Sequence, residues 1–267
     1  MEQQDSNLSR RVVHLIKGRP QPSKIYQLII NKEVTYSPAD QEANRCRDRA
    51  AMAMTFTSAG RVTEVFGGPV FRWDKQLKKA FKIPDKRHFG LRREDLDWTQ
   101  ERILVSGMGV VKRSQKLIEK YGTQVTTRDD FAIPLQRGLY SNPFWDQLVP
   151  FGWLILEYLV RFAPKAGKLF PFEGKRAYQI IREDTGNYPN WFRSQAEHFY
   201  GHYLLTDTLK LAKFVQVQDP KSVKHYIGYS WTEQLKDTKM YMDFEWIDPT
   251  IEQIRNRIQG NRSGIPL

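Results

Sequence analysis

Two arginines and a tyrosine, far apart in the chain, offer the clearest chemistry in this sequence. Tyr226 lies in the stretch FVQVQDPKSVKHYI, where Asp-Pro is typical of a helix start and apolar residues recur at helical spacing. A phenol oxygen can act as a nucleophile, and guanidiniums such as those of Arg61 and Arg193 suit a phosphate group. By periodicity alone Tyr226 is a core residue, and each arginine is a surface residue or the partner of a carboxylate such as Glu64. Whether the three form one site depends on the elements that position them.

The composition limits the class of partner. The chain has 267 residues with 40% hydrophobic content, enough for one large domain with a real core. A net charge of +12 indicates an acidic partner, most often nucleic acid and next an anionic membrane surface. The basic residues are spread over several segments, which favours a folded basic surface over a charged tail. A charge excess that serves only solubility is the competing interpretation.

The cysteine content, the N-terminus and the apolar runs indicate the cellular compartment and whether a membrane is involved. Cys46 is the only cysteine, which excludes a disulfide framework or a cysteine-rich zinc site within the chain. The N-terminus is polar and lacks the apolar core of a signal peptide. The longest apolar run, residues 148–160, contains Glu157 and is too short to span a bilayer. We therefore expect a soluble cytoplasmic protein that has no membrane partner.

The first half of the chain predicts helices around the first arginine. Residues 1–37 read as an arm or linker containing a strand or short helix at 24–30. Ser37-Pro38 is typical of a helix start, and a buried helix follows until the Ser-Ala-Gly break at 58–60. Arg61 then lies in the first turn of a short helix. Residues 70–90 are basic and aromatic without periodicity, which indicates a solvated loop or a DNA-facing insertion.

The middle of the chain predicts a small antiparallel sheet. Strands are expected at 101–105 and 110–111 and again within 123–135, where Asp129-Asp130 marks a turn. Lys112 would lie near one of the turns of this sheet. From residue 144 onward the pattern is helical, with Arg193 near the start of one helix and a terminal helix at 249–258. The expected fold class is therefore α+β, mainly α-helical with a small antiparallel sheet.

This order of elements resembles the catalytic domain of tyrosine recombinases, the family of phage and archaeal-virus integrases and Xer proteins. TSAGRVTEVFGG resembles the family's T-G-x-R-x-x-E-L-x-x-L, with Arg61 on the first catalytic arginine and Glu64 on the glutamate. LRREDLDWTQERILVSGMGVVKR resembles the strand hairpin that carries the family's lysine. Lys112 is the candidate for that lysine and Lys116 is its rival.

Two further motifs extend the resemblance. NWFRSQAEHFYGHYLL resembles the helix that opens with H-x-x-R, with Arg193 on the second arginine and Asn190 where histidine is usual. FVQVQDPKSVKHYI aligns with L-L-G-H-x-x-x-x-T-T-x-x-Y, with Tyr226 on the nucleophile and Val217 on the usual histidine or tryptophan. Tyr229 and Tyr241 compete with Tyr226, but only Tyr226 keeps the family's spacing.

The resemblance implies a domain organisation and an activity. Residues 38–230 would form the catalytic domain, and residues 231–267 a C-terminal segment that reaches a neighbouring subunit. The implied enzyme is a site-specific DNA recombinase or integrase that acts as a tetramer on double-stranded DNA through a 3′-phosphotyrosine intermediate, so the protein would be associated with DNA in the cytoplasm. Neither a cofactor nor a metal is expected, because two arginines take the place of the metal.

The residues themselves explain how such a reaction would run. Arg61 and Arg193 would neutralise the charge that gathers on the non-bridging phosphate oxygens, and Lys112 would protonate the leaving oxygen. Asn190 can donate a hydrogen bond to phosphate but cannot shuttle a proton at neutral pH, and Val217 can do neither. These two departures motivate a competing hypothesis, a DNA-binding accessory protein on the same fold that has lost cleavage.

Two more hypotheses stay open, one for the whole chain and one for a histidine pair. A nicking-closing enzyme of the type IB topoisomerase kind would use the same chemistry without a defined site or paired duplexes. His198 and His202 lie four residues apart on one expected helix and could form a metal pair. An obvious third ligand is missing from the sequence, which favours a polar helix face or a phosphate contact for these histidines.

Overall fold

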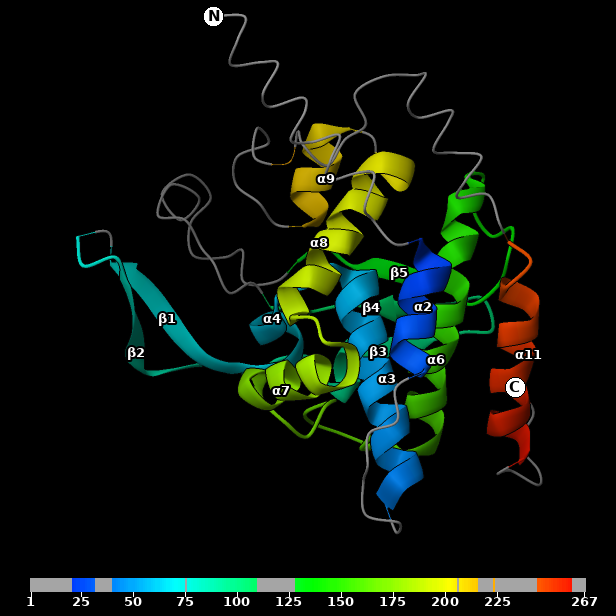
Figure 1. The fold of residues 1–267 in the computed structure, drawn as a ribbon, viewed down its shortest axis with the longest axis horizontal. Helices are drawn as coiled ribbons and strands as arrows, with labels where there is room; N and C mark the ends of the chain where they lie inside the picture. Colours follow the sequence, from blue (N-terminus) through cyan, green and yellow to red (C-terminus); the bar gives the residue numbers. More distant parts are fainter. Residues whose placement is uncertain are drawn as a thin grey trace, which may run out of the picture.

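Two long helices, α3 (Gln41–Ser58) and α6 (Val149–Arg161), lie against each other in the middle of the molecule (Figure 1). This computed structural model describes residues 21–31, 40–74, 76–109, 128–205, 207–215, 223 and 244–260. The Ala- and Met-rich second half of α3 is buried from Ala50 to Ser58, and α6 begins with a proline in its first turn. The buried helix expected before the Ser-Ala-Gly break is confirmed; its expected start at Ser37-Pro38 lies outside the described residues.

The other helical elements surround this pair. Asp207 caps α9 (Thr208–Phe214), because its side chain accepts from the backbone N–H groups of Leu209 and Lys210. The elements are α2 (Pro22–Ile30), α4 (Val62–Phe66), the 3₁₀ segments η2 (Arg93–Asp95) and η4 (Pro143–Leu148), α7 (Gly174–Thr185), α8 (Pro189–Phe199), the π-helical turn η5 (Tyr200–Leu204), α9 (Thr208–Phe214) and α11 (Ile247–Gly260).

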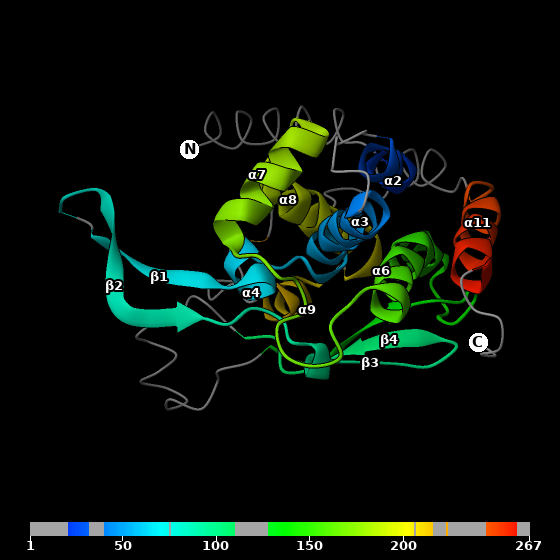
Figure 2. The same ribbon diagram turned by 90° about the horizontal axis from the view of Figure 1, so that it is seen from below.

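A three-stranded antiparallel sheet packs against α6 (Figure 2). Its strands are β3 (Leu96–Trp98), β4 (Arg102–Val105) and β5 (Phe131–Pro134), in the order β3-β4-β5. In β4 buried and exposed residues alternate, so one face of the sheet is apolar and covered by helix. The described chain is thus mainly helical with a small antiparallel sheet, which confirms the expected α+β class. The strand expected at 110–111 lies outside the described residues.

Residues 68–88 form a second antiparallel pair, which the sequence did not indicate. Strands β1 (Gly68–Asp74) and β2 (Lys79–His88) make a hairpin that projects away from the helices (Figure 1). The expectation of a solvated loop here is wrong. The strands were missed because the described strand side chains that the sequence could have shown as alternating, those of Lys79, Phe81, Lys82 and Arg87, are all exposed. Exposed positions impose no alternation of apolar and polar residues.

Both terminal segments contribute to the main core where they are described. The segment at 24–30 is helical, and Ile25, Tyr26 and Ile29 of α2 are almost completely buried. Ile254 and Ile258 of α11 are also buried, and α11 packs along α6. Among the described helices, none combines the length and apolar character needed to cross a membrane.

Candidate active site

The turn between α3 and α4 positions Arg61. Ala59 adopts the left-handed conformation with φ 47°, and Gly60 packs so tightly that a Cβ there would lie 2.5 Å from the Met108 side chain. Arg61 is the N-cap residue of α4. Its backbone N–H donates to Glu64 Oε2 at 2.8 Å, and its Nη1 donates to Glu64 Oε1 at 2.6 Å. The R-x-x-E spacing in the sequence is therefore a direct contact in the structure.

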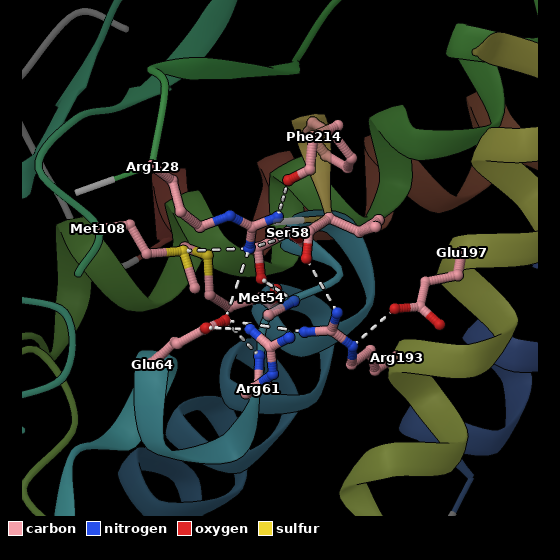
Figure 3. A network of polar contacts seen from close by, with 11 residues as sticks. Met54, Ser58, Arg61, Glu64, Met108, Arg128, Arg193, Glu197 and Phe214 are labelled. Atoms are coloured by element: carbon pink, nitrogen blue, oxygen red, sulfur yellow. Dashed lines mark hydrogen bonds and ion pairs between the residues drawn. The ribbon is translucent and has the colours of Figure 1, made fainter. Parts of the chain in front are cut away.

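Glu64 lies at the centre of three guanidiniums (Figure 3). Its side chain is fully buried, and its Oε2 lies 3.8 Å from Arg193 Nη1 and 3.9 Å from Arg128 Nη1. Burial raises the pKa of Glu64, but the guanidiniums of Arg61, Arg128 and Arg193 and a backbone hydrogen bond lower it by more, so the pKa lies below its ordinary value. This one carboxylate faces three cations, an arrangement that favours a further anion.

Arg193 is the residue of this cluster that comes from the second half of the chain. On α8, its Nε donates to Glu197 Oε1 at 2.7 Å and its Nη2 donates to the carbonyl oxygen of Val215 at 3.0 Å. Its Nη1 is buried, makes no hydrogen bond within the described residues and faces Glu64 as an ion pair. Burial lowers the pKa of Arg193, against the raising effect of Glu197. The structure thus joins Arg61 and Arg193, 132 positions apart in the chain, through one carboxylate.

Arg128 is the member of the cluster that sequence reasoning missed. It precedes β5 and its side chain is 1% exposed, and its Nη1 donates to the carbonyl oxygen of Ser58 at 2.9 Å. Its Nη2 donates to the carbonyl oxygen of Phe214, whose ring its guanidinium overlies. Burial lowers the pKa of Arg128 to about 10, so it stays charged at neutral pH. Nothing in its local sequence distinguishes Arg128 from the other basic residues of the chain.

Exposure divides the three arginines into two kinds. The side chain of Arg61 is 21% exposed and that of Arg193 is 10% exposed, whereas Arg128 is enclosed. Arg61 can therefore reach a bound anion in this structure, while Arg193 lies beside it on the same carboxylate with its Nη1 buried. A phosphate is the anion whose oxygens match the forked donors of two guanidiniums.

The remaining predicted site residues fall outside this cluster. Asn190 is exposed in the first turn of α8, one turn before Arg193. Lys112, Tyr226 and Val217, with the rivals Lys116, Tyr229 and Tyr241, lie outside the described residues. Three residues before Tyr226, Val223 is completely buried.

The histidine pair on α8 and η5 does not extend into a larger ligand set in the described part of the chain. His198 is 8% exposed, and His202 lies in the π-helical turn. Among the described residues there is no group of three or more His, Cys, Asp or Glu side chains arranged to hold a metal ion.

The chain was compared with protein families, curated proteins and solved structures. No family model, no curated protein and no solved structure matches the chain. The functional argument therefore depends on the residues and their geometry.

Proposed function

We propose that this protein is a DNA strand transferase of the tyrosine-recombinase type, which cleaves and rejoins DNA at a specific site through a 3′-phosphotyrosine intermediate. The observation that carries the proposal is the cluster of Arg61 and Arg193 around Glu64. Two guanidiniums from helices distant in sequence, that of Arg61 partly exposed and that of Arg193 buried, lie on one buried carboxylate. The tyrosine-recombinase catalytic fold and a tetramer on double-stranded DNA belong to the same proposal.

In the proposed reaction the phenol oxygen of Tyr226 attacks the scissile phosphorus. A phosphotyrosyl bond forms as the phenol gives its proton to solvent, the bond from phosphorus to the 5′ oxygen breaks, and Lys112 supplies the proton that this oxygen takes. Arg61 and Arg193 neutralise the charge on the non-bridging oxygens, which is larger in the transition state than in the substrate. The 5′ hydroxyl of a second strand reverses the step at a new junction, so the bond energy is conserved.

Glu64 and Arg128 act in this scheme as positioning residues. Glu64 fixes the rotamer of Arg61 by accepting from both its backbone and its side chain. Arg128 holds together the end of α3 and the end of α9 through the carbonyl oxygens of Ser58 and Phe214. Asn190, exposed at the start of α8, is assigned a hydrogen bond to a phosphate oxygen and no proton transfer.

A DNA-binding accessory protein without cleavage is the second candidate. Arg61 and Arg193 both have carboxylate partners, Glu64 and Glu197, and these contacts alone give them a structural role. The two candidates share the bound duplex and differ in whether a covalent bond forms.

Trapping of the covalent intermediate separates these candidates. The protein and its Tyr226→Phe variant are incubated in EDTA with nicked duplexes that cover the flanks of its own gene and a randomised pool. A band that survives SDS, disappears with protease and is absent for Tyr226→Phe supports the proposal. A band that persists in the variant moves the nucleophile to Tyr229 or Tyr241. Salt-sensitive duplex binding without any band favours the accessory protein.

A further inference from the structure

The β1–β2 hairpin extends from the helical body on one side of the molecule, as both ribbon views show (Figures 1 and 2). The hairpin is residues 68–88. Strand β2 has 10 residues but shifts register against β1, so the 7 residues of β1 set the length of the ribbon, about 23 Å at about 3.3 Å per residue. This is about two thirds of one turn of B-form DNA, which is about 34 Å.

The hairpin concentrates positive charge. Residues 68–88 include seven lysines and arginines and two aspartates, so 21 residues carry +5 of the net +12 of the chain. Lys78, Lys79, Lys82 and Arg87 are exposed. A two-stranded ribbon of this kind presents its cations on a narrow, elongated surface, which matches a row of phosphates better than a compact anion.

Exposed aromatic rings accompany these cations. Of the seven large hydrophobic side chains that are exposed in the described chain, Leu77, Phe81 and Phe89 lie on the hairpin or directly after it. Lys79 Nζ lies 5.7 Å from the centre of the Phe81 ring, and the guanidinium of Arg92 lies 5.1 Å from that of Phe89. Aromatic rings beside cations are typical of surfaces that bind nucleic acid.

The root of the hairpin is fixed to the helix that carries the active-site arginine. A Cβ at Gly90 would lie 2.5 Å from the backbone nitrogen of Gly67, so the two ends of the hairpin touch. The Leu91 N–H donates to the carbonyl oxygen of Val65 on α4 at 3.0 Å. Arg87 forms an ion pair with Glu173, beside α7. The direction of the hairpin is thus set relative to α4, which begins at Arg61.

We propose that the β1–β2 hairpin is a duplex-binding extension that contacts DNA beside the cleaved phosphate, within one helical turn of it. The identity of the duplex as partner rests on the proposed function. Lys78, Lys79 and Lys82 contact phosphates, and the ribbon fits the width of a major groove. A membrane surface fits less well, because among the described side chains of the hairpin the exposed Leu77 and Phe81 are interspersed with exposed cations.

Neutralising the exposed lysines tests the extension. The variant K78Q/K79Q/K82Q is compared with K24Q/R102Q/K165Q, which removes three exposed charges from α2, β4 and the segment after α6. Each phosphate contact changes the slope of log affinity against log salt by about 0.9. Between about 50 and 200 mM salt the hairpin variant should therefore lose about 40-fold less affinity than the unmodified protein. Its footprint on the duplex should shorten by about 7 base pairs, the length of duplex that about 23 Å covers.

A site-directed cleavage reagent gives a second, independent readout. Leu77→Cys places a thiol at a position that is 67% exposed, whereas the natural Cys46 is buried and does not react. An iron–EDTA group on Cys at 77 should cut bound duplex at one cluster of positions. Two results would contradict the proposed extension. One is that K78Q/K79Q/K82Q has the same salt slope and footprint as the control variant. The other is that the labelled Leu77→Cys protein leaves the bound duplex uncut. Vesicles of anionic lipid that compete fully with DNA would also overturn the extension, in favour of a membrane.

The outcome for the hairpin is separable from that for the proposed function. If K78Q/K79Q/K82Q loses part of the footprint but the unmodified protein forms no covalent complex, the duplex-binding role of the hairpin is supported and the transferase activity is contradicted. If the unmodified protein forms a covalent complex and the footprint of K78Q/K79Q/K82Q is unchanged, the transferase activity is supported and the duplex-binding role of the hairpin is contradicted.

Discussion

Arg193 Nη2 donates a hydrogen bond to the carbonyl oxygen of Val215 at 3.0 Å, which ties α8 to the end of α9. Val215 lies 11 positions before Tyr226 in the chain. The same guanidinium faces Glu64 on α4. One side chain therefore links the helix that begins at Arg61 with the segment that leads to the proposed nucleophile. The predictions below follow from this cluster and from the packing around it.

Replacing Glu64 with Gln should destabilise the protein strongly at neutral pH. The substitution keeps the size of the side chain but leaves three guanidiniums without their shared carboxylate. Removal of one partner from a buried ion pair costs about 3–5 kcal/mol of unfolding free energy. Urea unfolding of both proteins at neutral pH measures this difference.

The pH dependence of the same pair tests the electrostatic origin. The pKa of Glu64 is lower in the folded state than its ordinary value, so the unfolded state binds the proton more tightly. Its stabilising effect is complete above the ordinary pKa and is lost as the pH falls through the folded pKa. The gap between the unmodified protein and Glu64→Gln should therefore narrow as the pH falls below the ordinary pKa of a glutamate, about 4.3. A gap that stays constant over this range would show that packing, not charge, accounts for the loss.

Arg128→Met should lower the unfolding free energy by about 3 kcal/mol or more, because it leaves the carbonyl oxygens of Ser58 and Phe214 without their donor. Arg102→Met is the matched control, since Arg102 is exposed on β4, and it should change stability by less than about 0.5 kcal/mol. Denaturant titration of the two variants measures both values. Equal, small effects would contradict the view that Arg128 holds α3 and α9 together.

Arg257→Met should loosen α11 while leaving the α3–α6 pair intact. Arg257 makes two hydrogen bonds to the buried Glu157, at 2.8 and 2.9 Å, and these raise the pKa of Arg257 above its ordinary value. Loss of a charged hydrogen-bonded pair costs about 1.5–3 kcal/mol. Hydrogen exchange at residues 247–260 should accelerate accordingly.

Arg255→Met is the control on the same helix. Arg255 is exposed and lies over the Trp153 ring at 4.8 Å, so its loss should change exchange in α11 much less. Equal acceleration in both variants would mean that the Arg257–Glu157 pair does not anchor the helix.

Local patterns predicted the parts of the site that are local in space. Glu64 lies three positions after Arg61, so the R-x-x-E motif and the preceding Ser-Ala-Gly break contain the whole of that contact. The cap at Asp207 is local in the same way, because Asp207 accepts from the N–H of Leu209, two positions later. The family resemblance brought in Arg193, whose contacts with Glu64 no local pattern contains.

Long-range contacts explain what the sequence did not reveal. Arg128 is a buried residue only because Ser58 and Phe214, 70 and 86 positions away, supply its acceptors. Strand β3 is three residues long and has one buried side chain, Leu96, too short for an alternation to appear. The β1–β2 hairpin lacks a buried face in its described side chains, so its strands carry no periodic signal.

The most direct test of the account is whether Arg193 acts on the charge of the scissile phosphate. Covalent-complex formation by the unmodified protein and by Arg193→Ala is measured in single turnover on two nicked duplexes. One duplex has the natural phosphate, and the other has a neutral methylphosphonate at the scissile position. Folding of the variant is checked by its denaturant midpoint, because Arg193 also contacts Glu197 and Val215.

The account predicts that Arg193→Ala slows the reaction about 100- to 1,000-fold on the phosphate. It also predicts that the defect largely disappears on the methylphosphonate, where no charge remains to be neutralised. An equal defect on both duplexes, in a variant that is folded and binds DNA, would contradict the account and assign Arg193 to the support of the fold.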